Sequence, residues 1–272
     1  MHRAITFVVA FVVAATLATT TVGPGLAVAA KPPAGELVVF EAASLKEAFA
    51  TLAARFEKEH AGAHVVTNTA GSQELRAQIE HGAVADVFAS ADQRHMNALA
   101  SEGLVVAPAL FACNEPVIVV RSGLGASLKT FADLPRAERI VVGAPEVPIG
   151  AYTAQIWQKA AAKLGADFTA RLQAKVVSHE LNVRQVLAKV VLGEADAGIV
   201  YRSDAIAAKG KGKETIAVVE IPPELNVTAA YPIAALKAAP NPTLARAFID
   251  LVRSPAGATV LREAGFVPCP GR

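Results

Sequence analysis

The stretch that decides the fold is ELVVFEAASLKEAFATLAARF, at residues 36–56. Residues 37–40 form a short apolar run, which is typical of a buried β-strand. Beyond it, apolar residues recur at helical spacing: Leu45, Ala48, Phe49, Leu52, Ala53 and Phe56. Ser44 stands where a helix N-cap belongs, and Glu47 three residues later completes a capping-box pattern. The segment therefore predicts a strand that leads directly into a helix.

The rest of the chain repeats this alternation. Apolar runs predict further strands at residues 64–66, 86–89, 116–120, 140–143, 175–177, 197–201, 216–221 and 231–236. Helices are predicted at residues 74–79, 150–164, 182–192, 203–208 and 242–252. Such alternation indicates an α/β protein with a parallel sheet. Because there is no internal repeat and no low-complexity linker, we expect two α/β lobes in one chain that crosses between them more than once.

The N-terminal segment is expected to lie outside this fold. His2 and Arg3 precede an apolar run at residues 4–18, and Ala27-Val28-Ala29 resembles a cleavage signature. We interpret residues 1–30 as a cleavable secretory signal peptide, so the mature protein should be periplasmic. The alternative is an uncleaved membrane anchor, for which the apolar run is short.

The composition and the motifs bear on the class of function. Apolar residues make up 53% of the chain and charged residues 18%, which suits a packed core. The net charge of +2 and the lack of a basic stripe argue against nucleic acid as a partner. The histidines show no metal-ligand spacing, and there is no G-x-S-x-G elbow and no phosphate-cradling G-x-x-x-x-G-K-[ST] loop. We therefore expect a protein that is not an enzyme, and a secreted enzyme is the alternative from another class.

Two cysteines, Cys113 and Cys269, lie in the predicted mature chain. In an oxidising compartment such a pair can form a disulfide. The alternative is two separate thiols, because sequence alone does not show whether the two Cα atoms come within reach.

Three helix starts follow predicted strands and have unusual chemistry: residues 42–45, 70–73 and 147–152. Ligands of open α/β sheets bind beyond the carboxyl ends of the strands. Helix N-termini carry unpaired N–H groups and partial positive charge, so they can bind anions without Lys or Arg. Taken singly, Ser44 and Ser72 are more often plain N-caps than ligand contacts.

Several blocks in order carry a more specific signal. These are EAASL at 41–45, AGSQEL at 70–75, ADVFASAD at 85–92, VGAPEVPIGAY at 142–152, NVR at 182–184, ADAGIVYRSDA at 195–205 and AGF at 264–266. Their order and spacing resemble the periplasmic molybdate-binding protein family. The resemblance covers the chain from about Glu36 to Phe266.

The resemblance implies a two-lobe fold of the type II periplasmic binding protein kind, with a ligand cleft between the lobes. We place lobe I at residues 36–113 and 232–272 and lobe II at residues 114–231. The family's ligand contacts fall on five positions: the side chains of Ser44 and Ser72, the backbone of Ile149 and Val183, and the hydroxyl of Tyr201. Ile149 departs from the family, in which a smaller residue is common.

The resemblance also implies the ligand and the partners. It indicates molybdate or tungstate as the ligand, with no cofactor, and delivery to an ABC transporter permease driven by its ATPase. We expect a monomer. None of the five positions is acidic, which favours molybdate, tungstate or sulfate over phosphate, because these anions present only acceptors. Another anion, such as sulfate or phosphate, is the alternative ligand, and Glu41, Glu146 and Glu180 lie near the motifs and leave open a carboxylate in the coordination.

Overall fold

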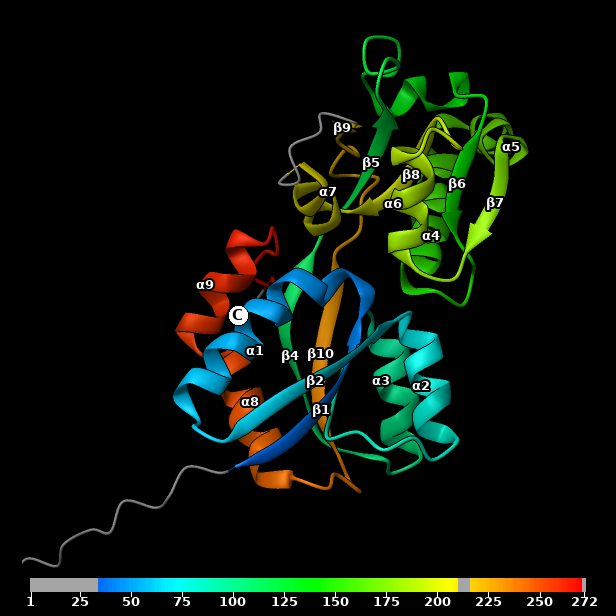
Figure 1. The fold of residues 1–272 in the computed structure, drawn as a ribbon. Coiled ribbons are helices and arrows are strands. Elements are labelled where there is room, and N and C mark those ends of the chain that lie inside the picture. Colours follow the sequence, from blue (N-terminus) through cyan, green and yellow to red (C-terminus); the bar gives the residue numbers. More distant parts are fainter. Residues whose placement is uncertain (1–33, 210–215, 271–272) are drawn as a thin grey trace, which may run out of the picture. The chain divides into compact units, whose positions relative to one another are not determined.

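The computed structural model describes residues 34–209 and 216–270, which belong to one compact unit. The signal peptide predicted at residues 1–30 lies outside the described residues. Two five-stranded sheets form the centres of two lobes (Figure 1). The predicted two-lobe α/β fold is therefore confirmed. None of the helices in the described ranges is long and apolar enough to cross a membrane.

The first sheet has the strand order β2-β1-β3-β10-β4. Its strands are β1 (Gly35–Ala42), β2 (Ala63–Ala70), β3 (Val87–Ala89), β4 (Val105–Asn114) and β10 (Ala229–Leu236). β1 pairs in parallel with β2 and β3, whereas β10 pairs antiparallel with β3 and β4.

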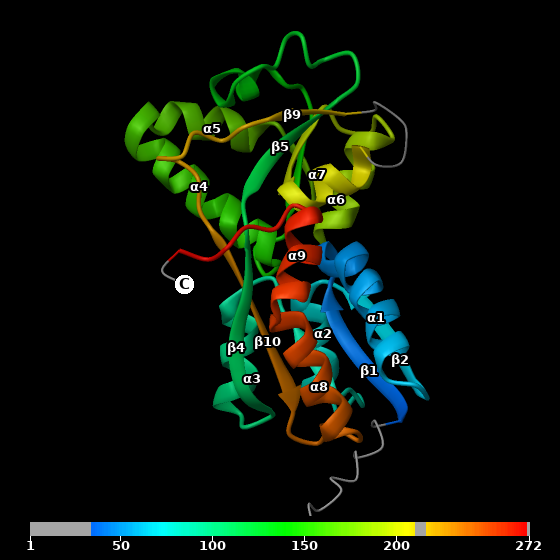
Figure 2. The same ribbon diagram turned by 90° about the vertical axis from the view of Figure 1, so that its left-hand side faces the viewer.

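Helices cover both faces of the first sheet (Figures 1 and 2). One face carries α1 (Lys46–Glu59), α8 (Pro242–Arg253) and α9 (Pro255–Glu263), and the other carries α2 (Ser72–Glu80) and α3 (Gln93–Ser101). Successive side chains of a strand point to opposite faces. Val39 accordingly packs in the cluster that contains Phe49, while Phe40 packs in the cluster that contains Leu75. The apolar run at residues 37–40 is thus apolar throughout because both faces of β1 are covered.

The second sheet has the strand order β7-β6-β8-β5-β9. Its strands are β5 (Pro116–Arg121), β6 (Ile140–Gly143), β7 (Val176–Glu180), β8 (Ala197–Tyr201) and β9 (Ile216–Val219). The lobe also contains a 3-10 helix (Phe131–Arg136) and the helices α4 (Pro148–Leu164), α5 (Ala166–Ala174), α6 (Val183–Val191) and α7 (Arg202–Lys209). β6 pairs in parallel with β7 and β8, but β5 pairs antiparallel with β8 and β9.

The expectation of parallel sheets is therefore wrong for part of each sheet. Parallel neighbours need a crossover connection, usually a helix. β5 and β10 instead enter their sheets directly from the other lobe: β5 follows β4 after Glu115 alone, and β10 follows β9 without a helix between them. These connections carry the chain between the lobes, near Asn114 and before Ala229. The predicted end of lobe II at residue 231, near Tyr231, falls inside β10. The lobe boundaries at residues 113/114 and 231/232 stay a prediction.

The predicted capping box at Ser44 is wrong. Ser44 lies inside a 3-10 helix, Ala43–Leu45, and α1 begins only at Lys46 without a side-chain cap. The Ser44 hydroxyl instead bonds with the phenol of Tyr231, at 2.9 Å. Tertiary contact overrides the local capping pattern here, and Ser44 lies in the 3-10 turn between β1 and α1 rather than at the N-cap of α1.

The structure joins Cys113 and Cys269 in a disulfide, with their Cα atoms 5.0 Å apart. The backbone makes the same connection, since Cys113 and Val267 exchange N–H···O bonds of 3.0 and 2.8 Å. The bond ties the C-terminal segment to β4, at the point where the chain leaves the first lobe.

Replacing both cysteines, by Cys113→Ser with Cys269→Ser, should lower the free energy of unfolding by about 2–4 kcal/mol, because the cross-link restricts the unfolded chain. The two residues are 156 positions apart, so the loop released is long. Urea unfolding of the wild type with and without reductant, beside the double variant, measures this. Equal stability of oxidised wild type and double variant would contradict it.

Candidate functional site

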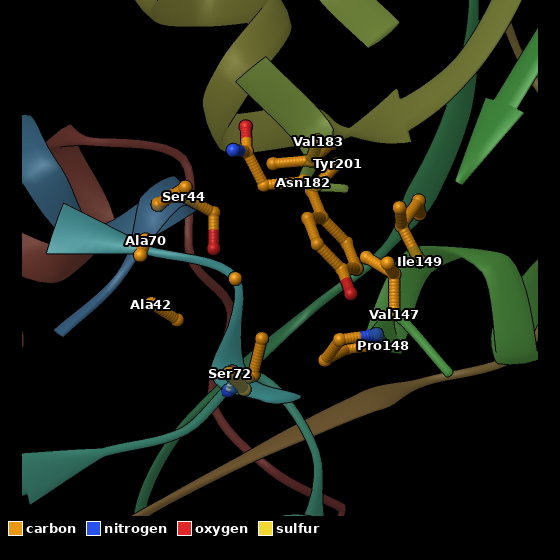
Figure 3. Close-up of a pocket in the computed structure, with 13 residues that line it drawn as sticks. Ala42, Ser44, Ala70, Ser72, Val147, Pro148, Ile149, Asn182, Val183 and Tyr201 are labelled. Carbon is orange, nitrogen blue, oxygen red and sulfur yellow. Dashed lines mark hydrogen bonds between the residues drawn. The ribbon is translucent and has the colours of Figure 1, made fainter. Parts of the chain in front are cut away.

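A small pocket forms where four helix starts from the two lobes meet (Figure 3). The cavity is small, with a volume of about 10 Å³. A cavity of this size does not accommodate a bulky organic ligand. The pocket is lined by Ala42, Ala43, Ser44, Ala70, Gly71, Ser72, Ala91, Val147, Pro148, Ile149, Asn182, Val183 and Tyr201. All three helix starts singled out in the sequence contribute, and the start of α6 is the fourth.

The structure brings all five predicted ligand positions to this pocket. Ser44 and Ser72 come from the first lobe, and Ile149, Val183 and Tyr201 come from the second. Each of the five is buried. Their role as ligand contacts stays a prediction, but the geometry places them around one point.

Neither serine caps a helix. Ser72 is the first residue of α2, whose N-cap is Gly71, and the Ser72 hydroxyl oxygen accepts a bond from the N–H of Ala91 at 3.0 Å. A hydroxyl has one proton and can accept as well as donate. With its oxygen occupied by a backbone donor, Ser72 keeps its proton for the pocket.

The second lobe contributes backbone donors. Pro148 is the first residue of α4 and has no N–H, so the first N–H of that helix belongs to Ile149. Val183 is the first residue of α6, and the side chain of Asn182 caps the next two N–H groups, of Arg184 and Gln185. The first N–H groups of a helix have no carbonyl partner within it. Ile149 and Val183 are therefore placed to donate into the pocket.

Tyr201 supplies a further hydroxyl. It ends β8, its side chain is 1% exposed, and its hydroxyl is buried without a hydrogen-bond partner. Figure 3 shows this hydroxyl pointing into the space between the helix starts. Burial raises the pKa of Tyr201 well above its usual value, so the group stays a protonated phenol that can donate. A buried hydroxyl in a folded protein normally has a hydrogen-bond partner, so the Tyr201 hydroxyl is suited to donate to an acceptor in the pocket.

Charged side chains stay outside the pocket, since none is among its described lining residues. Glu146 turns its carbonyl oxygen toward His95, 3.0 Å from Nε2, and Glu180 pairs with Lys189 at 2.8 Å. Glu41 is 1% exposed and accepts a bond of 2.8 Å from the Thr69 hydroxyl. Burial raises the pKa of Glu41 to about 7. The three carboxylates that the sequence left open thus do not line the pocket.

Polar contacts join the two lobes around the pocket. Arg184 of α6 makes a two-pronged ion pair with Glu47 of α1, and its Nε lies 2.8 Å from the fully buried Asp204 of α7. On the opposite side, the Gln73 amide donates to the carbonyl of Leu181 at 2.6 Å. Gly71 lies under the same carbonyl, and a Cβ there would be only 2.5 Å from the Leu181 oxygen. The lobes approach so closely at this point that residue 71 has no room for a side chain.

Comparison with known proteins agrees with the fold. The family model for bacterial extracellular solute-binding proteins matches residues 37–267. The chain belongs to this family. It is 40% identical to the molybdate-binding protein of Mycobacterium tuberculosis, with 87% of this chain and 88% of that protein covered.

Two solved structures extend the comparison. The substrate-binding domain of a putative molybdenum ABC transporter from Clostridium difficile is 31% identical, with a TM-score of 0.64 over 86% of this solute-binding protein and 99% of that chain. The sulfate-binding protein of Mycobacterium tuberculosis is 19% identical, with a TM-score of 0.76 over 87% and 88% of the two chains, and this likeness shows the fold alone.

Some features of the site were missed in the sequence. Pro148 is the first residue of α4 and Asn182 is the N-cap of α6, and they position the N–H groups of Ile149 and Val183. Pro at N1 and Asn at the N-cap are common, so the sequence could have indicated both roles. Tyr231 has no such signal. Its partner Ser44 is 187 positions away, so only the fold brings the two hydroxyls together.

The buried Glu41 predicts a pH dependence of stability. Its ordinary pKa of 4.5 rises to about 7 in the folded protein. Between these values only the folded state keeps the proton, so the free energy of unfolding should fall as pH rises from about 4.5 through 7, by roughly 3 kcal/mol. Glu41→Gln should lack the part of the fall due to Glu41 and be more stable than the wild type at pH 8, while the buried Asp204, whose pKa is raised to about 6, leaves a smaller fall at lower pH.

Urea unfolding at pH 5 and pH 8 measures the effect, with the exposed Glu224→Gln as the control that keeps the wild-type slope. If Glu41→Gln keeps the same slope as the wild type, Glu41 does not titrate in this range.

Proposed function

We propose that this solute-binding protein captures molybdate, and tungstate with it, for an ABC importer. The observation that carries the proposal is the pocket itself, in which hydroxyl and backbone donors converge and none of the described lining residues is charged. The molybdate-binding relative and the molybdenum-transporter relative, matched at 40% and 31% identity, support the same ligand.

The donor set suits a fully deprotonated oxyanion. Such an anion offers only acceptors, and bonds to a charged acceptor are stronger than neutral ones. Ser44, Ser72 and Tyr201 offer hydroxyls, and Ile149 and Val183 offer N–H groups at helix N-termini, where the helix dipole adds partial positive charge. Several neutral donors can therefore hold a dianion without a formal positive charge in the wall.

The same set disfavours phosphate. At neutral pH part of the phosphate carries a proton, and that proton needs an acceptor at the site. Within residues 34–209 and 216–270, no carboxylate lines the wall to accept it. Sulfate meets the donor requirement as well as molybdate does, and the fold is shared with a sulfate-binding protein, so sulfate is the second candidate. Molybdate and sulfate differ in size, and the pocket must separate them by fit.

Capture is proposed to proceed by closure of lobe II, residues 114–231, onto lobe I, residues 36–113 and 232–272. Serine donors lie on one side and the remaining donors on the other, so an anion bound between them favours the closed state. The Arg184–Glu47 ion pair and the Gln73–Leu181 bond act only when the lobes are together. The closed monomer is then proposed to dock on a membrane permease with its ATPase.

The proposed function also implies the cellular compartment in which the protein acts. The family is extracellular, and we propose that residues 1–30 are the signal peptide that directs the chain to the periplasm. The protein is proposed to bind and release its ligand unchanged, as its binding-protein relatives suggest, with no cofactor and no catalysis.

Calorimetric titration of the mature protein with molybdate, sulfate and phosphate, at fixed pH and salt, tests the ligand. Molybdate should bind tightly in a one-to-one complex, and phosphate should not compete. Ser72→Ala should weaken molybdate binding by roughly 1–3 kcal/mol, because it removes one donor to a charged acceptor. Tight binding of sulfate with none of molybdate would overturn the ligand, and unchanged affinity of Ser72→Ala would misplace the site.

Loss of the ion pair between the lobes should weaken binding more mildly. Glu47→Gln leaves Arg184 paired with Asp204 but removes its partner in the first lobe, and the pair is partly exposed. We expect a loss of about 0.5–1 kcal/mol in affinity for molybdate, smaller at high salt. Glu59→Gln is the matched control, because the Arg55–Glu59 pair lies within α1 and spans no cleft. An equal effect of the two substitutions would show that the Glu47 pair does not favour closure.

A further inference from the structure

Tyr231 lies behind the pocket and does not line it. It belongs to β10, its side chain is 0% exposed, and its hydroxyl is 2.9 Å from the hydroxyl of Ser44. Either oxygen could donate in the structure as it stands. The direction of this bond matters, because Ser44 has a single proton to give.

The ring of Tyr231 is held from three sides. The centroids of Phe266, Tyr201 and Phe111 lie 5.3, 5.8 and 6.4 Å from its own, all at steep angles. Edge-on aromatic packing of this kind fixes both the ring plane and the position of its hydroxyl. The phenol oxygen is therefore a stationary partner for Ser44.

The ligand decides the direction of the bond. An oxyanion accepts only, so Ser44 must point its proton at the anion and can then only accept from Tyr231. Resting on the proposed function, we propose that Tyr231 is a positioning residue: it donates to the Ser44 oxygen and so turns the Ser44 proton toward the bound oxyanion. Burial keeps Tyr231 protonated by raising its pKa well above the usual value.

The other serine shows the same arrangement with a different donor. The Ser72 oxygen accepts from the backbone N–H of Ala91, which cannot reverse its role. Both serines that line the pocket thus have their oxygen engaged by a fixed donor behind them and their proton free in front. For Ser44 that donor is a side chain, so its contribution can be removed without changing the backbone.

A double-mutant cycle separates this role from a packing role. The four proteins are wild type, Tyr231→Phe, Ser44→Ala and the double variant, each titrated with molybdate by calorimetry. Tyr231→Phe should weaken binding about fivefold to tenfold, a loss typical of one hydrogen bond. In the Ser44→Ala background the same substitution should change the affinity by less than about twofold, because no serine proton remains to be oriented.

Tyr152→Phe is the matched control. Its phenol accepts from the N–H of Ala230 at 3.2 Å, and its ring packs on Tyr201 at 6.4 Å, but Ser44 is not its partner. It should bind molybdate as the wild type does. Thermal melts of the ligand-free proteins check folding. For a Tyr231→Phe protein that does not fold, NMR of tyrosine-labelled wild type takes its place, and the Tyr231 hydroxyl proton should move downfield on addition of molybdate.

The outcomes distinguish this inference from the proposed function. If the wild type binds molybdate but Tyr231→Phe binds equally well, or loses the same factor with and without Ser44, the positioning role is overturned and the function stands. An unmoved Tyr231 hydroxyl proton overturns it in the same way. If the wild type binds no oxyanion at all, the proposed function fails and this inference fails with it.

Discussion

The constraint on which the rest of the structure depends is the burial of helix N-termini. The first N–H groups of every helix lack partners within it, and a buried N–H that stays unpaired is costly. Here the starts of the 3-10 helix Ala43–Leu45 and of α2, α4 and α6 converge on one pocket. Water or an acceptor ligand must complete them. The fold thereby favours an anion at the place where these N–H groups meet, and the two sheets hold the helix starts in position around it.

The chain meets this demand without placing a cation in the wall. Small residues such as Ala42, Ala70 and Gly71 let the backbone approach, and the charged groups are kept behind or beside the pocket. Arg184 is the nearest example, since its neighbour Val183 lines the pocket while its own guanidinium is occupied by Glu47 and Asp204. An arginine that is already paired contributes to holding the lobes together rather than to binding the anion. This division lets affinity depend on geometry, which discriminates among anions better than charge does.

The sequence predicted much of this because strand and helix signals were strong where both faces of an element are buried. β6 and β8 match their predicted ranges, and the three helix starts all reached the pocket. β4, α3, α5 and α9 were missed. β4 (Val105–Asn114) is apolar along most of its length, but Pro108 interrupts the run, and a proline within a run argues against a regular strand. Ser44 was assigned a capping role because capping is a local pattern, and its actual partner Tyr231 is distant in sequence. Pairing direction failed for the same reason, since it depends on where β5 and β10 enter each sheet.

The C-terminal AGF block shows how a distant segment can serve the site without touching it. Gly265 has a φ of 92°, a left-handed conformation that ends α9 and that other residues adopt only with strain. The turn sends Phe266 inward, where its ring meets Tyr231 edge-on at 5.3 Å. The next residues are held by the Cys113–Val267 bridge and the Cys113–Cys269 disulfide. Phe266 therefore cannot leave Tyr231 without breaking these attachments. A ring that is fixed in this way holds the Tyr231 hydroxyl beside the Ser44 hydroxyl, which follows β1. Segments far apart in the sequence thus meet behind the pocket, and the disulfide holds the C-terminal one in place.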